Sequence, residues 1–204
     1  MARSRDQDRF DDQRQKILAT AASVFSEKGF HRATMDDIAE RLGTTKGSIY
    51  YYFKSKDVIL YEICDAAQDD ALKYLHEIRS DDSLTEAARL NALIARHLQG
   101  MEDNVDAWTV FFLELGSRND PKAQAIRKKQ RQFSTGLEQM LTDAMESNDF
   151  RSVLPARLVV LAILGMCNWS YRWIKHEPWA ADKIAGVLSD LLYQGLVPTK
   201  PSGR

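Results

Sequence analysis

The five prolines of this 204-residue chain all lie where the helical spacing of its apolar residues lapses. Proline lacks a backbone N–H and is excluded from helix interiors, so prolines confined to the ends of periodic segments are typical of a helical chain. No alternation of apolar and polar residues is long enough to predict a strand. The sequence therefore predicts an all-α fold. The prolines are Pro121, Pro155, Pro178, Pro198 and Pro201.

Apolar residues at helical spacing predict about nine helices. Gly29 and Gly43 are expected to end the first two in the left-handed conformation. The eighth helix is apolar nearly all round, so we expect it to be covered on every side. The two ends, 1–10 and 198–204, are expected to be disordered. The expected helices span about 11–28, 35–42, 45–52, 55–78, 87–101, 108–115, 126–144, 156–175 and 184–195.

The net charge of −1, from 28 basic and 29 acidic residues, does not by itself indicate a nucleic-acid partner. The charge is nevertheless divided along the chain. Residues 1–57 carry 11 Lys or Arg and 9 Asp or Glu, a net +2, whereas residues 58–204 carry 17 and 20, a net −3. This small asymmetry is compatible with a weakly basic N-terminal region, residues 1–57, which we call the head, followed by an acidic region, residues 58–204.

The longest uninterrupted apolar run has ten residues, 158–167. A membrane-spanning helix needs about 18 to 20. The charged N-terminal stretch has no apolar core of a signal peptide, so the chain is expected to stay in the cytoplasm and away from membranes. Cys64 and Cys167 lie far apart without metal-ligand spacing and are expected to be buried, free thiols.

The second and third helices are short, follow one another after a glycine-containing turn and are preceded by a longer helix, as in a helix-turn-helix. The third would present small polar side chains to base edges, while tyrosine hydroxyls and lysines would hold phosphates. The alternative is an ordinary solvated surface. The polar residues of this segment are Thr44, Thr45, Lys46, Gly47, Ser48, Tyr50, Tyr51, Tyr52, Lys54 and Lys56.

The stretch TMDDIAERLGTTKGSIYYYFKSKDVIL, with ILATAASVFSEKGFHRATMDDIA overlapping it upstream, resembles the N-terminal DNA-binding domain of TetR/AcrR-family transcriptional regulators. The resemblance implies a DNA-binding domain with an N-terminal arm over 1–57 and a helical ligand-binding and dimerisation domain over 58–204. It also implies site roles. Thr34, Tyr50, Tyr51 and Lys56 would contact phosphates, Thr45, Lys46, Gly47 and Ser48 would face base edges, and Tyr52 stands where many members have histidine.

In this family, helices four to seven enclose a ligand pocket, and helices eight and nine pair with their symmetry mates. The resemblance thus implies a homodimer on a palindromic double-stranded DNA operator, with a small-molecule effector, and it accounts for the apolar eighth helix. The NWSYRW pattern resembles family repressors of fatty-acid and steroid-ring catabolism, whose inducers are acyl-CoA thioesters. In the steroid-ring group the arginine of the matching Arg-Trp pair lies in the inducer site; here it is Arg172, and Asn168 replaces an expected tryptophan.

The candidate ligand residues combine aromatic rings with two polar side chains. Asn168 and Arg172 lie four residues apart on one face of an apolar helix, where each needs a partner or a ligand. In the alternative, Arg172 pairs with an acid such as Glu114 or caps carbonyls, and the aromatic residues are plain core. The candidates are Trp108, Phe111, Phe112, Asn168, Trp169 and Arg172; the basic cluster of Arg127, Lys128, Lys129 and Arg131 either meets ligand phosphates or forms a solvated face.

Two other classes of function are alternatives to a ligand-responsive repressor. The first is an all-α enzyme acting on an acyl-CoA-like ligand; but His31, His76, His97 and His176 have no metal or nucleophile spacing, and no Gly-rich phosphate loop or GxSxG elbow occurs. No catalytic residue, metal ligand or cofactor is therefore predicted. The second is a helical interaction module that has lost DNA binding, which the retained Thr34, Lys46, Tyr50 and Lys56 disfavour.

Overall fold

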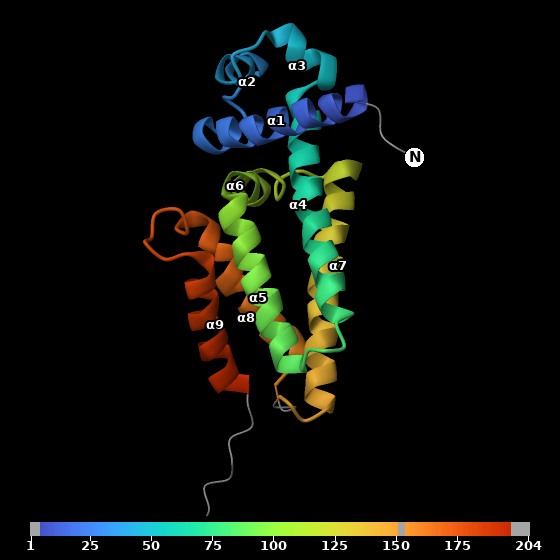
Figure 1. Cartoon of the computed structure of the whole chain (residues 1–204), viewed down its shortest axis with the longest axis vertical. Coiled ribbons are helices and arrows are strands. Elements are labelled where there is room, and N and C mark those ends of the chain that lie inside the picture. The colour runs from blue at the N-terminus through green and yellow to red at the C-terminus, as the bar shows by residue number, and fades with distance from the viewer. Residues whose placement is uncertain (1–4, 151–153, 197–204) are drawn as a thin grey trace, which may run out of the picture. The chain divides into compact units, whose positions relative to one another are not determined.

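A computed structural model describes residues 5–150 and 154–196 (Figure 1). In these residues the chain forms nine α-helices, one 3₁₀ turn and no strand, which confirms the all-α prediction. The elements are α1 (Arg5–Lys28), α2 (Met35–Arg41), α3 (Lys46–Tyr52), α4 (Lys56–Arg79), α5 (Glu86–Asp103), α6 (Val105–Glu114), α7 (Pro121–Glu146), α8 (Ala156–Trp169), the 3₁₀ turn η1 (Ser170–Arg172) and α9 (Ala181–Leu196).

Two expectations were wrong at helix ends. Residues 5–10 were expected to be disordered but form the start of α1, with Asp6 and Asp8 in a first turn whose unpaired N–H groups favour negative charge. The eighth helix ends at Trp169 rather than near residue 175, because the chain tightens into η1 at Ser170, whose carbonyl accepts from the Trp173 N–H at 3.0 Å. Residues 198–204 lie outside the described part of the chain.

The stops after α1 and α2 are as predicted. Gly29 has φ 78° and Gly43 has φ 64°, conformations that a side chain disfavours. Glycine at these two positions therefore determines where the first two helices of the chain end.

The described chain divides into two compact units, which we treat separately. The first contains residues up to 68 and 106–126; the second contains 69–105 and the residues from 127 onward. Helices α4 and α7 contribute residues to both units. These bounds differ from the predicted functional domains, 1–57 and 58–204, because α6 and the start of α7 group with the N-terminal helices. The functional boundary at residue 57 stays a prediction.

The core of the first unit is built from side chains that α1, α2, α3 and α4 turn toward one another. Ile17, Ile38, Ile49 and Ile59 are completely buried, and Phe53 nearly so. Helix α2 buries Met35, Ile38 and Ala39 in this core and α3 buries Ile49, so the polar face of each short helix lies outward.

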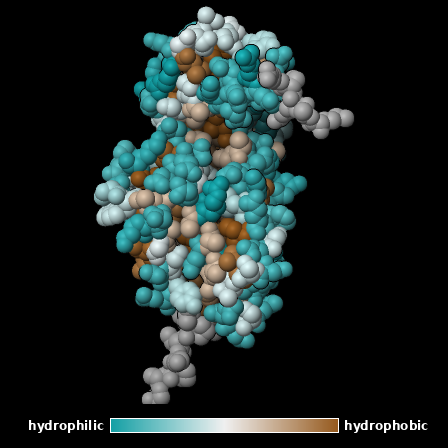
Figure 2. Space-filling view, viewed as in Figure 1, coloured by the Kyte–Doolittle hydropathy of each residue, from teal (hydrophilic) through white to brown (hydrophobic). Residues whose placement is uncertain are grey.

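The second unit packs parts of α4, α5, α7, α8 and α9 around one apolar cluster. Its helices α8 and α9 also leave large apolar side chains exposed, namely Leu158, Leu161, Trp169, Val187, Leu191 and Tyr193. Most of the face drawn in Figure 2 is hydrophilic, with hydrophobic patches between. None of the helices in the described chain is long and apolar enough to cross a membrane.

Candidate nucleic-acid interface and effector region

Helix α3 turns one apolar side chain inward and its polar side chains outward. Ile49 is buried, whereas Tyr50 and Tyr51 are 46% and 75% exposed. The Thr45 hydroxyl accepts from the Ser48 N–H at 3.2 Å and so caps the start of the helix. The outward face is the one that the sequence predicted to meet DNA.

Gly47 leaves open space on the second residue of α3. A Cβ atom built there would meet only the Thr45 hydroxyl oxygen, at 3.8 Å, which is ordinary contact. The protein's own packing therefore does not require glycine at this position. The predicted role of Gly47, to face base edges, stays a prediction.

The hydroxyl of Thr34 is used in the capping box of α2. Thr34 Oγ1 accepts from the Asp37 N–H at 3.2 Å and donates to Asp37 Oδ2 at 2.8 Å. Lys28 Nζ donates to the other carboxylate oxygen at 2.6 Å. The bonds from Lys28 and then Thr34 hold the pKa of Asp37 at about 2. Thr34 therefore positions α2, and its contact to phosphate stays a prediction.

The end of α3 packs against an aromatic residue that the sequence reasoning missed. The Phe10 ring lies 4.8 Å from the Tyr52 ring and 6.0 Å from the Tyr51 ring, centroid to centroid. This contact gives the first turns of α1 an apolar partner, so it accounts for a helix where disorder was expected. Tyr52 is thus held by packing, whether or not its hydroxyl reaches a phosphate.

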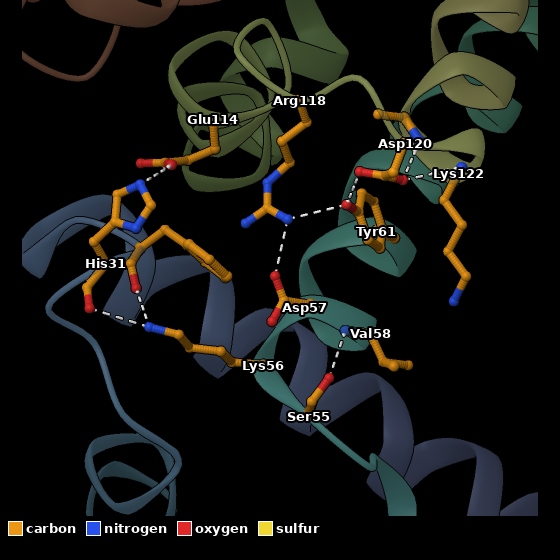
Figure 3. Close-up of polar contacts among 12 residues, drawn as sticks. His31, Ser55, Lys56, Asp57, Val58, Tyr61, Glu114, Arg118, Asp120 and Lys122 are labelled. Carbon is orange, nitrogen blue, oxygen red and sulfur yellow. Dashed lines mark hydrogen bonds and ion pairs between the residues drawn. The ribbon is translucent and has the colours of Figure 1, made fainter.

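Lys56, at the start of α4, uses its ammonium group inside the first unit (Figure 3). Its Nζ donates to the carbonyl oxygens of Phe30 at 2.8 Å, His31 at 3.1 Å and Ala33 at 3.0 Å, and lies 4.6 Å from the centroid of the Phe30 ring. An ammonium has three N–H donors, so all three are engaged in these bonds. Lys56 therefore holds the segment between α1 and α2. Its side chain would have to give up one of these bonds to donate to a phosphate, so the phosphate contact stays a prediction.

Arg118, between α6 and α7, contacts the same Phe30 ring and donates hydrogen bonds to side chains of α4 (Figure 3). Its guanidinium lies 4.7 Å from the ring centroid and donates from Nη1 to Asp57 Oδ1 at 2.8 Å and to Tyr61 Oη at 3.0 Å. The Tyr61 hydroxyl donates in turn to Asp120, and burial followed by this bond raises its pKa. Partners some 60 positions apart leave no local pattern, which is why the sequence did not reveal this network.

The aromatic candidates on α6 form one cluster within the first unit. The rings of Trp108, Phe111 and Phe112 have centroids 5.2 to 5.8 Å apart. Trp108 and Phe111 are buried and Phe112 is half-buried.

The other three candidates belong to the second unit, where Asn168 has a partner in the protein. His97, on α5, is buried between Tyr74 and Asn168: Asn168 Oδ1 lies 2.9 Å from His97 Nε2, and Tyr74 Oη lies 2.6 Å from His97 Nδ1. Because an amide oxygen only accepts, Nε2 donates and Nδ1 accepts from the Tyr74 hydroxyl. This assigns a neutral imidazole, and burial lowers the pKa of His97.

Arg172 does not share an apolar helix face with Asn168, contrary to expectation, because α8 has already ended. It lies on the 3₁₀ turn η1, is exposed, and places its guanidinium 4.6 Å from the centroid of the exposed Trp169 ring. Glu114, suggested as its partner, lies 3.8 Å from His31 instead. In the basic cluster, Lys129 Nζ pairs with Asp69 at 2.6 Å.

Two family models match the chain. One, described as bacterial regulatory proteins of the tetR family, matches residues 17–63; the other, described as a tetracyclin repressor-like C-terminal domain, matches residues 83–196, more than half of the chain. The chain belongs to the TetR family. It is thus a DNA-binding transcriptional regulator, in a family of regulators rather than enzymes, and the resemblance inferred from its sequence is confirmed.

Three similar proteins illustrate the likeness. The fatty acid metabolism regulator protein of Bacillus subtilis is 26% identical over 163 residues, covering 79% of this chain and 84% of the relative. The ketosteroid regulator KstR2 of Mycobacterium tuberculosis superposes with a TM-score of 0.85 at 23% identity, covering 92% and 96%. AibR, solved with isovaleryl coenzyme A and operator DNA, superposes with a TM-score of 0.77 at 19% identity, covering 88% and 97%. The two structures show that the fold is shared.

Lys56→Ala is expected to destabilise this TetR-family head by about 1 to 3 kcal/mol, because three carbonyl oxygens lose a charged donor. Lys54→Ala is the matched control, since Lys54 is exposed two residues earlier and makes no hydrogen bond or ion pair with residues 5–150 or 154–196. Urea unfolding of the two variants provides the measurement. Equal stability of Lys54→Ala and Lys56→Ala would show that the carbonyl contacts of Lys56 contribute nothing.

Proposed function

We propose that this protein is a homodimeric repressor that a small apolar or acyl-CoA-type effector releases from a palindromic operator. The observation that carries the proposal is the outward polar face of α3 in a chain whose residues 17–63 match the TetR-family head. A two-fold dimer would set its two recognition helices one DNA turn, about 34 Å, apart. The protein would act in the cytoplasm, without catalysing a reaction.

The proposed DNA contacts lie in the first unit. The N-terminal residues of α3 would read base edges, and hydroxyl and ammonium groups around it would meet phosphates. The residues proposed are Thr34, Thr45, Lys46, Gly47, Ser48, Tyr50, Tyr51, Tyr52 and Lys56.

The proposed dimer surface is the exposed apolar face of α8 and α9. Leu158, Leu161 and Leu191 are 62%, 51% and 62% exposed. Several large apolar side chains exposed on two helices are typical of an interaction surface rather than of a solvated one. A second copy of the chain would bury them in a four-helix arrangement.

An acyl-CoA effector is supported by two relatives of the chain and by its aromatic residues. One relative is a fatty acid metabolism regulator, and AibR was solved with isovaleryl coenzyme A. We propose that Asn168, Trp169 and Arg172, in the second unit, bind the effector. Trp108, Phe111 and Phe112 belong to the first unit, and their predicted contact with the effector is proposed separately. Release needs a ligand that prefers the DNA-incompetent state by about 1 to 3 kcal/mol, which gives about 5- to 150-fold derepression.

A gel shift with the promoter region beside its own gene, with and without a series of acyl-CoAs, tests the proposal. Wild type is expected to bind the duplex and to be released by at least one acyl-CoA, whereas coenzyme A alone and the free acid leave it bound. Absence of a shift would contradict operator binding. Turnover of the acyl-CoA would favour the enzyme alternative instead.

Arg172→Ala is expected to keep operator affinity and to lose release, because the exposed guanidinium is far in the chain from the DNA-binding residues and free to meet an anionic ligand. Arg172→Lys, which keeps the charge but not the planar stacking on Trp169, is expected to retain part of the response. The acyl-CoA concentration for half-release measures both. Unchanged release in Arg172→Ala, or loss of operator binding, would contradict the assignment.

A further inference from the structure

The first residue of α3 is ion-paired to an acid in the first turn of α2. Lys46 Nζ lies 2.6 Å from Asp36 Oδ2, across the turn that joins the two helices. The side chains are 49% and 63% exposed, so the pair faces outward. Its hydrogen bond raises the pKa of Lys46, which stabilises the ammonium form.

The Asp36 carboxylate lies in the first turn of α2, where negative charge is favoured, but unlike its neighbour it caps no backbone group. Asp37 caps α2 through Thr34 and binds Lys28, whereas Lys46 is the only recorded partner of Asp36 in the described chain. An ion pair this exposed contributes little to stability. A carboxylate beside the DNA-reading helix also repels phosphates, so it weakens binding to DNA of any sequence. Its presence there calls for a function in the bound state.

A G·C base pair has the pattern that this side-chain pair complements. In the major groove guanine presents the acceptors O6 and N7, which a lysine can contact, and cytosine presents the N4 amino donor, which an aspartate can accept. O6 and N4 are hydrogen-bonded to each other, about 2.9 Å apart, close to the 2.6 Å between Lys46 Nζ and Asp36 Oδ2. With one ammonium proton on Asp36, two remain for guanine O6 and N7.

We infer that Lys46 and Asp36 act together as one reader of a G·C pair in each half-site, with Asp36 as a specificity-determining residue that the sequence reasoning did not include. The inference rests on the proposed DNA-binding face of α3. Asp36 would discriminate in two ways: it accepts from cytosine N4, and it withholds the Lys46 charge from phosphates of wrong sites. If an A·T pair replaced it with thymine in the place of cytosine, the Asp36 carboxylate would face thymine O4, which is also an acceptor.

Selection from a pool of random 30-base-pair duplexes with the full-length protein tests the pair. Wild type is expected to enrich a palindrome with one strongly preferred G·C pair in each half-site. Asp36→Ala is expected to weaken the preference at that position alone, by about fivefold or more in discrimination, while Lys46 still favours guanine. The variant is also expected to bind mixed-sequence DNA about two- to fivefold more tightly. Asp36→Asn is expected to move the preference toward adenine, which an amide reads through N6 and N7.

Glu40→Ala is the matched control, because it removes the same charge from an exposed position of α2 one turn later. It is expected to leave the selected motif unchanged. If Asp36→Ala and Asp36→Asn both enrich the wild-type motif at every position, or if both lose all DNA binding while their melting temperatures match wild type, the inference is overturned. Wild type enriching no motif would instead contradict the proposed operator-reading face itself, and this inference with it.

Discussion

Leu191→Glu is expected to convert the dimer into monomers and to lower operator affinity about 10²- to 10⁴-fold, the gain that two linked half-site contacts give over one. Leu191 is 62% exposed on α9, on the same side as Val187. A glutamate there stays hydrated in the monomer but loses its water when it is buried against an apolar partner helix, which is costly. The fold of the monomer should survive, because the replaced side chain contributes little to its own core.

Molar mass by light scattering and affinity for the promoter duplex measure the two effects. Thr135→Glu, which adds the same charge at an exposed position of α7, is the control and should leave both unchanged. Dimers of Leu191→Glu that bind the duplex like wild type would exclude this face as the interface. Monomers that keep full affinity would instead show that operator binding does not need the dimer.

His97→Ala is expected to destabilise the second unit by about 3 kcal/mol or more. The change leaves a cavity beside Phe133, whose ring stacks on the imidazole at 5.4 Å. It also leaves the buried Tyr74 hydroxyl without its acceptor and the Asn168 oxygen without its donor, each costly where water is excluded. Because His97 of α5 contacts Tyr74 of α4, Phe133 of α7 and Asn168 of α8, four helices lose a shared contact.

Denaturant unfolding measures the loss, and His76→Ala, the same change at an exposed position of α4, is the control.

The pH dependence of the unfolding free energy gives a second measurement. Burial lowers the pKa of His97 below 6.5, so the unfolded chain binds a proton that the folded chain does not. Stability is therefore complete above pH about 6.5 and falls as the pH drops below it, by at most about 1.4 kcal/mol per pH unit. His97→Leu should lack this part of the slope; a variant with the wild-type slope and stability would contradict the network.

Local signals were sufficient for the fold of the head. Gly29 and Gly43 end their helices where the sequence indicated, since only a left-handed residue closes those turns without strain. Thr34 and Thr45 cap α2 and α3, each by accepting a hydrogen bond from the backbone N–H three residues later in the chain. These caps and stops depend on residues within one helical turn of each other, so the sequence alone reveals them. The same stretch also carries the family resemblance.

The partners of individual side chains were decided by tertiary packing. Lys56 meets carbonyls 23 to 26 positions away, and His97 meets Asn168 71 positions away. The sequence indicated that the Asn168 amide needs a partner or a ligand, without deciding which; the fold supplies His97 as a partner. A helical repeat states which face of a helix is buried, but not which residue of another helix lies against it. That choice depends on how the helices pack, which is why the elements and the family followed from the sequence, and the Lys46–Asp36 pair and the buried histidine only from the structure.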